Sequence, residues 1–261
     1  EERYYINLGR MFELMNNLGK AKEYYERAIA VSPRSERASI ALGVVYREEG
    51  AYDVAKTYFL SALKYNSASW EAMRHLGVLN ELRGDYDRAI FRYVNALKLN
   101  PDNGELLHLL GSAYAKKGDF PAAIRFFRQR VALNPSSTEA RGQLGMALEQ
   151  AGEYFDAVQQ LKKALEDEAE NTVYLNALGR CYVALERWEM AHSCFVDVVK
   201  ADPDNLDARL QLGIIEYKRK RYDQAEKYLR GVLALNAASA DARYYVGMIE
   251  VHRKNYDKAR N

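Results

Sequence analysis

Apolar residues fall on two helical faces within each stretch of 34 residues along the chain. Positions 4, 7, 8 and 11 of a stretch share one face because an α-helix turns about every 3.6 residues, and positions 20, 24 and 27 share a second face. In residues 36–69 the second face carries Ala55, Phe59 and Ala62. The pattern predicts two antiparallel helices in every stretch, each burying one face against the other.

A glycine at position 8 and an alanine at position 20 mark the period. The glycines are Gly9, Gly43, Gly77, Gly111, Gly145, Gly179, Gly213 and Gly247, and the alanines run from Ala21 to Ala259 at the same interval. These small residues let two helix backbones approach closely, and a fixed period of this size is the signature of a stacked repeat array. We expect one array over residues 1–261, with repeats 2–35, 36–69, 70–103, 104–137, 138–171, 172–205, 206–239 and a partial repeat 240–261 that ends within its second helix.

Residues at two further repeat positions, 15 and 17, predict how each repeat is built. Gly50, Gly84, Gly118 and Gly152 stand at position 15, where the end of a helix favours a residue that tolerates positive φ. A large residue recurs at position 17, for example Tyr52, and we expect it to fill the space beside the glycine contact.

With Leu-Gly at positions 7 and 8, alanine at 20 and proline at 32, the chain resembles the tetratricopeptide repeat family over essentially its whole length. The resemblance implies an all-α fold, a right-handed α-solenoid superhelix of antiparallel helix pairs. It also implies that the first helices line a concave groove and that the protein is a non-catalytic scaffold for protein–protein interaction.

Composition narrows the classes of partner. The formal net charge is +2, so the basic excess typical of nucleic-acid binding is missing, and no apolar run is long enough to cross a membrane. Two cysteines favour a reducing compartment, the cytoplasm, with the periplasm as the alternative if a signal peptide has been removed. His75 and His108 alone are too few for a zinc site, so we expect no metal and no cofactor.

The predicted groove is lined by first-helix residues that face away from the second helix. These are Arg10, Ile40, Val44, Arg47, Arg74, His75, Val78, His108, Met146, Arg180, Leu210, Ile214, Tyr217, Tyr244 and Met248. Arginine and aromatic residues are enriched in binding hot spots, so the groove is predicted to hold a peptide or a helix of another protein. For the apolar C-terminal part, coverage by another element is an equal alternative.

Charged residues replace apolar ones in the last two repeats. Arg209 and Arg243 occupy position 4, and Glu216 and Glu250 occupy position 11, two turns away on the same face. We expect a structural ion-pair network within and between repeats seven and eight, because charges near a core require partners.

The sequence predicts no catalytic residues, because no nucleophile and base are brought together by spacing. Two other functions remain open. The chain could assemble with itself, head to tail, or it could recruit the substrate of a larger enzyme.

Overall fold

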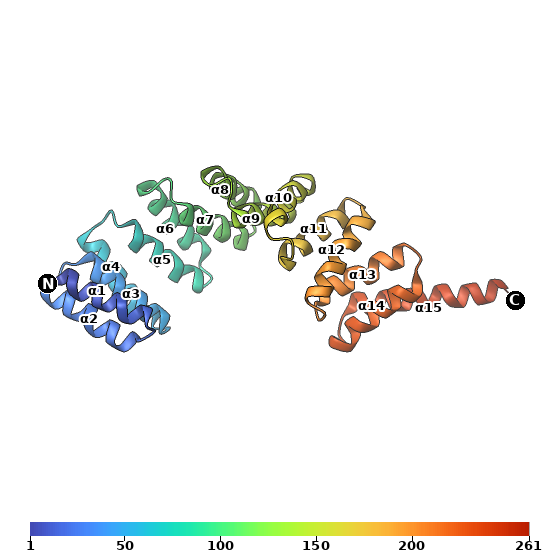
Figure 1. Ribbon diagram of the computed structural model, residues 1–261, viewed down its shortest axis with the longest axis horizontal. Helices are drawn as coiled ribbons and strands as arrows, with labels where there is room; N and C mark the ends of the chain where they lie inside the picture. The colour runs from blue at the N-terminus through green and yellow to red at the C-terminus, as the bar shows by residue number, and fades with distance from the viewer. Residues whose placement is uncertain (261) are drawn as a thin grey trace. The chain divides into compact units, whose positions relative to one another are not determined.

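The computed structural model describes residues 1–260, with side chains for residues 1–254. The chain divides into two compact units, Glu1–Leu133 and Asn134–Asn261. Unit 1 consists of four antiparallel helix pairs that follow one another along the chain (Figure 1). The pairs are α1 (Glu2–Leu14) with α2 (Leu18–Val31), α3 (Glu36–Glu48) with α4 (Tyr52–Tyr65), α5 (Trp70–Leu82) with α6 (Tyr86–Leu99), and α7 (Gly104–Lys117) with α8 (Phe120–Leu133).

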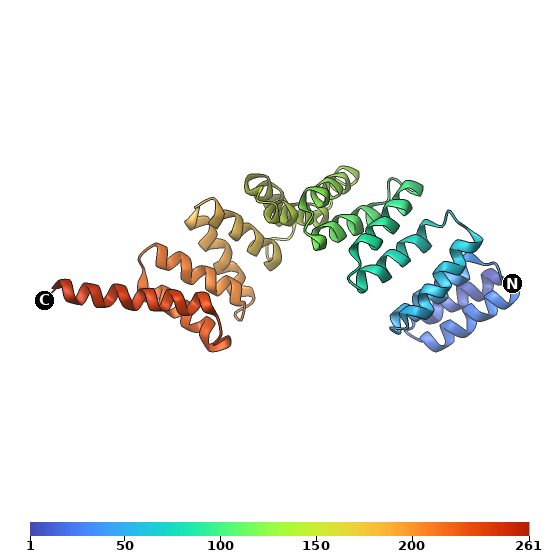
Figure 2. The ribbon, with the colours of Figure 1, turned by 180° about the vertical axis from the view of Figure 1, so that it is seen from behind.

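Unit 2 repeats the same design three times and ends in a single helix (Figures 1 and 2). Its elements are α9 (Thr138–Gln150), α10 (Tyr154–Asp167), α11 (Thr172–Ala184), α12 (Trp188–Ala201), α13 (Leu206–Lys218), α14 (Tyr222–Leu235) and α15 (Ala240–Arg260). Consecutive helices pack against each other, and α9 also contacts α11. The predicted all-α fold of helix pairs is confirmed, while the extent of a single array stays a prediction.

The glycine of each complete repeat lies under one side chain of the second helix. A Cβ added at Gly43 would lie 2.5 Å from the ring of Phe59, and one at Gly213 would lie 2.7 Å from Leu229. The contacting residue stands at position 24 in each of the seven repeats: Tyr25, Phe59, Tyr93, Phe127, Leu161, Phe195 and Leu229. The glycine is therefore covered from position 24 and not from position 17. At position 17 Tyr52 is exposed, whereas Leu18 and Tyr222 are half-buried and pack against core clusters. Position 17 is the first residue of the second helix, and position 24 lies about two turns further along that helix.

The turns within repeats use the left-handed backbone region that was predicted. The four glycines at position 15, such as Gly50 with φ of 78°, adopt positive φ. Asn16, Glu186 and Lys220 take the same conformation at the same position although they carry a Cβ. The left-handed region costs such residues about 1 kcal/mol, so packing of the following helix sets the turn in these repeats.

The first helix of each later repeat is capped by the side chain before it. Ser35 accepts a hydrogen bond from the backbone N–H of Ala38 at 3.1 Å, and Ser69 accepts one from Ala72 at 3.2 Å. Such a cap satisfies a backbone donor that the helix itself leaves without a partner. Ala38 and Ala72 are fully buried, so the cap holds the tightly packed end of the helix.

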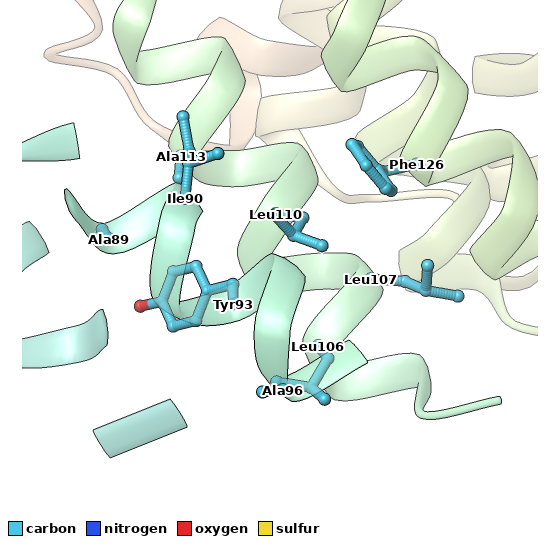
Figure 3. Close-up of a cluster of buried hydrophobic side chains, with 9 residues drawn as sticks. All are labelled: Ala89, Ile90, Tyr93, Ala96, Leu106, Leu107, Leu110, Ala113 and Phe126. Carbon is cyan, nitrogen blue, oxygen red and sulfur yellow. The ribbon is translucent and has the colours of Figure 1, made fainter. Parts of the chain in front are cut away.

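Between repeats, apolar clusters join a second helix to the next first helix. Figure 3 shows the cluster in which Tyr93 and Ala96 of α6 pack with Leu106 and Leu110 of α7, and Phe126 of α8 lies beside them. The hydroxyl of Tyr93 remains partnered, because it donates a hydrogen bond to Glu81 at 2.9 Å. Each repeat thus buries its apolar surface on its neighbour.

Residues 240–260 form one unbroken helix, so the prediction of a second helix in repeat eight is wrong (Figure 2). The other repeats turn at position 15, here Lys254, and then bury position 24 of the second helix against the glycine. In repeat eight the backbone stays helical through Lys254.

Candidate partner-binding surface

The first helices of unit 1 present a common face, which we call the unit 1 wall: the side of α1, α3, α5 and α7 that faces away from the second helices. A hollow of about 330 Å³ lies in this wall. Its apolar part is formed by Ile6, Ile40 and Val44, and Arg10 and Arg37 stand among its charged lining residues. Ile40, Val44 and Arg47 follow each other at helical spacing on α3, so one helix face supplies both apolar and basic groups.

The predicted groove residues of unit 1 differ widely in exposure. Arg10 is exposed, whereas Arg47, Arg74 and His108 are half-buried. Val44 and Val78 are half-buried and pack against core clusters. Ile40 and His75 are buried, and His75 keeps only 5% of its surface. These two contribute to the wall from beneath it, because their side chains pack toward the neighbouring second helix.

His75 lies between two arginines. Its ring stacks on Phe59, with centroids 4.9 Å apart and planes 6° apart. Its Nδ1 is 3.1 Å from a guanidinium nitrogen of Arg47, and its Nε2 is 2.9 Å from one of Arg74. Burial and the charges of Arg74 and Arg47 lower the pKa of His75 to about 3, so the imidazole is neutral.

Sequence reasoning missed a second hollow in unit 1, of about 630 Å³, on the side of the second helices. Val94 and Leu97 of α6 line it together with Phe126 of α8. Arg125 lies over the ring of Phe126 at 4.7 Å from its centroid. Its lining combines apolar residues with Lys98, Arg125 and Gln129, and no regular column of the repeat marks this combination.

In unit 2, the corresponding wall is formed by α9, α11, α13 and α15. Arg180 on α11 forms ion pairs with Glu149 at 2.9 Å and with Asp207 at 3.3 Å. The hydrogen bond from Arg180 to Glu149 raises the pKa of the guanidinium. Met146 is half-buried. Arg180 is therefore supplied with acceptors by its own chain.

The C-terminal part of the unit 2 wall is aromatic. The ring of Tyr217 meets Tyr245 edge to face at 5.2 Å, and Tyr245 meets Tyr244 at the same distance. The hydroxyl of Tyr217 also lies 3.2 Å from Nε2 of His252. Tyr244 is 61% exposed. Leu210, Ile214 and Met248 are half-buried.

The predicted pairing of Glu216 with Arg209 is wrong. Glu216 keeps 2% of its surface and is held by His192 at 3.1 Å, Arg219 at 2.9 Å and Arg221 at 3.6 Å. Arg209 lies instead 3.9 Å from Asp204. Two helical turns separate positions 4 and 11, whereas the turn after α13 brings Arg219 and Arg221, and the neighbouring α12 brings His192, directly to Glu216.

The charged pair of repeat eight is not part of a network with repeat seven either, in the part of the chain with described side chains. Arg243 and Glu250 are exposed on α15. The cation that links these two repeats is Arg253, which pairs with Asp223 at 2.7 Å and with Glu226 at 2.6 Å. Of the four predicted residues, Glu216 thus lies at the centre of a cluster between repeats six and seven, and a separate cluster around Arg253 joins repeats seven and eight.

Two features are absent from the described residues. No three His, Cys, Asp or Glu side chains among them lie where they could hold a metal ion. No helix within this part of the chain has the length and apolar character needed to cross a membrane.

Family models of the tetratricopeptide repeat match residues 2–35, 46–104, 82–142, 116–181, 176–237 and 210–260. The chain therefore belongs to the tetratricopeptide repeat family, whose members are protein–protein interaction scaffolds. No curated protein sequence matches the chain.

Solved structures share the fold. PilF of Pseudomonas aeruginosa superposes with a TM-score of 0.70 at 22% identity, covering 80% of this chain and 95% of that one. YrrB, described as a tetratricopeptide repeat protein with an unusual peptide-binding site, gives 0.64 at 23%, with coverages of 70% and 95%. A tetratricopeptide repeat protein from Parabacteroides merdae gives 0.65 at 16%, with coverages of 95% and 98%. Identities this low show the fold alone.

Proposed function

We propose that the unit 1 wall binds a peptide or helical segment of a partner protein and that the chain acts as a scaffold without catalysis. The observation that carries the proposal is the hollow beside Ile6, Ile40 and Val44, where arginines lie next to an apolar floor. Concave sites that combine apolar lining with a few charged groups are typical of ligand binding. Arginine is also among the residues that contribute most at interfaces.

Selection of peptides from a random displayed library on the full chain tests this proposal. We expect the selected peptides to bind at least about tenfold more weakly when Arg10 and Arg37 are both changed to Glu, because a lost charged contact is worth roughly 1.5–3 kcal/mol. The matched control changes Arg34 and Arg88, two exposed arginines that do not line this hollow, to Glu. Circular dichroism checks that helicity is unchanged in both variants.

Failure of the selection to yield any binder would contradict the proposal. Equal affinities of the wall variant and the wild type would do so as well. A loss in the control variant of the same size would show that only net charge matters.

A second candidate function, self-association, is favoured by α15. Among the side chains described for residues 1–254, none lies within 4 Å of a Cβ added at Gly247, unlike at the equivalent glycines of the seven preceding repeats. Tyr244 and Val251 on the same helix are exposed. A copy of the chain that covers this face would form a heterologous, head-to-tail contact. Sedimentation velocity over a range of concentrations should then show association that Gly247→Arg abolishes, and a monomer at all concentrations excludes this function.

A further inference from the structure

The groups around His75 include more hydrogen-bond donors than acceptors. A neutral imidazole has one N–H donor and one lone pair, whereas a guanidinium group has donors only. Both ring nitrogens of His75 face guanidinium nitrogens, from Arg47 on one side and Arg74 on the other. Only one of the two contacts can be a hydrogen bond, and in the other an N–H group faces an N–H group.

Arg74 also has an N–H donor, at Nε, that lacks an acceptor among the described residues. One terminal nitrogen donates to Glu105 at 2.6 Å, and the other faces His75. The Nε of Arg74 is buried and has no hydrogen-bond partner in the described part of the chain. A buried donor without an acceptor costs roughly 1–3 kcal/mol, so an acceptor that reaches this place is bound favourably.

The ring of His75 cannot rotate to relieve the mismatch, because it is buried and stacked on Phe59. Arg47 comes from α3, whereas Arg74 and His75 come from α5, so two neighbouring repeats fix the geometry. No carboxylate among the described residues pairs with Arg47. The arrangement is therefore a preorganised set of donors rather than a closed internal network.

The charges favour a monoanion. Arg47 and Arg74 carry two positive charges, and Glu105 compensates one of them. Glu71, one turn before Arg74 on α5, is exposed at the hollow beside this cluster and disfavours a second negative charge. A single carboxylate supplies two oxygen acceptors and one charge, which is what the cluster lacks.

We propose that Arg47 and Arg74 bind the side-chain carboxylate of an Asp or Glu in the partner segment, next to an apolar side chain of the same segment in the hollow at Val44. This inference rests on the proposed function of the wall and specifies the partner as an acidic segment with an adjacent apolar residue. Val44 lies one helical turn before Arg47 on α3, so neighbouring residues of the partner reach both places.

NMR titration of the ¹⁵N-labelled full chain tests the carboxylate site without knowledge of the partner. The probes are N-acetylglutamate amide, its neutral isostere N-acetylglutamine amide, and inorganic phosphate, at matched ionic strength. We expect the glutamate derivative to shift the Nε–Hε signal of Arg74 saturably. Arg47→Gln should raise the apparent Kd about tenfold, while Arg88→Gln on exposed α6 should leave it unchanged.

Three results would overturn the inference: equal shifts with the glutamine derivative, tighter binding of phosphate than of the glutamate derivative, or an unaltered Kd in Arg47→Gln. Its failure is distinct from that of the proposed function. If library-selected peptides bind the wall equally well after each Asp and Glu is changed to Asn and Gln, the carboxylate site is wrong and the binding wall stands.

Discussion

Arg180 of the unit 2 wall and Arg47 of the unit 1 wall have opposite surroundings. Arg180 in unit 2 is paired with Glu149 and Asp207 of its own chain. Arg47 in unit 1 faces a neutral, buried histidine. Both side chains belong to first helices and both were predicted to line a groove. A groove position alone therefore does not identify a binding residue, because the chain's own acceptors decide whether an arginine is available to a partner.

The largest expected effect is a loss of stability on removing Glu216, the buried carboxylate of unit 2. Glu216→Leu removes the buried carboxylate beside Arg219, whose side chain is 11% exposed, and leaves it paired with the exposed Glu189 at 2.7 Å. Breaking a buried ion pair by removing one partner typically costs about 3–5 kcal/mol. We expect a loss of this size in the free energy of unfolding, measured by urea titration, with faster hydrogen exchange in α13.

The matched control for Glu216 is its exposed counterpart in repeat eight. Glu250→Leu should change the free energy of unfolding by no more than about 0.5 kcal/mol. Similar losses of unfolding free energy in the two variants would show that the buried ion pairs of Glu216 do not stabilise unit 2.

The next effect concerns the pH dependence of unit 1. The folded pKa of His75, about 3, lies below the ordinary value of 6.5, so between these values the unfolded chain binds a proton that the folded chain does not. Stability therefore falls as pH is lowered from about 6.5 towards 3, by up to about 1.4 kcal/mol per pH unit from this one group.

His75→Gln removes this contribution. The difference in unfolding free energy between wild type and variant, measured by urea titration from pH 7 to pH 4, should change steadily in the variant's favour as pH falls. Parallel curves for the two proteins would mean that His75 is not held neutral between the arginines.

The smallest effect compares the two walls directly. Arg180→Gln leaves Glu149, whose side chain is 9% exposed, without its cation, and should cost about 1–3 kcal/mol. Arg47→Gln should cost no more than about 0.5 kcal/mol, because its contact with His75 is not an ion pair. Chemical denaturation of both variants measures the two losses of unfolding free energy. A larger loss for Arg47→Gln than for Arg180→Gln would contradict the difference between the two walls.

The repeat pattern predicted the helix pairs, the family and the turns, since these follow from small residues and glycines at fixed spacing. The covering residue at position 24, such as Phe59, was assigned to the wrong column. Both positions are mostly aromatic, and only the three-dimensional packing distinguishes them. The helix caps at Ser35 and Ser69 could have been found, because a serine before the first helix is a recognisable start signal.

The wall itself was harder to predict. Helical periodicity placed Arg47, Arg74 and His75 on the first helices, but it did not show that His75 is buried between the arginines. Nor could it pair Glu216, whose partners are His192 on α12 and the arginines of the turn after α13. Such contacts depend on how far side chains extend between neighbouring helices. The spacing of residues along one helix does not give this information.

The most direct test of the binding wall is to map a library-selected peptide on the full chain by NMR. The account predicts that backbone amide shifts concentrate at Val44, Arg47 and Arg74 on α3 and α5. Shifts concentrated at Val94, Leu97 and Phe126, in the hollow beside the second helices, would contradict it.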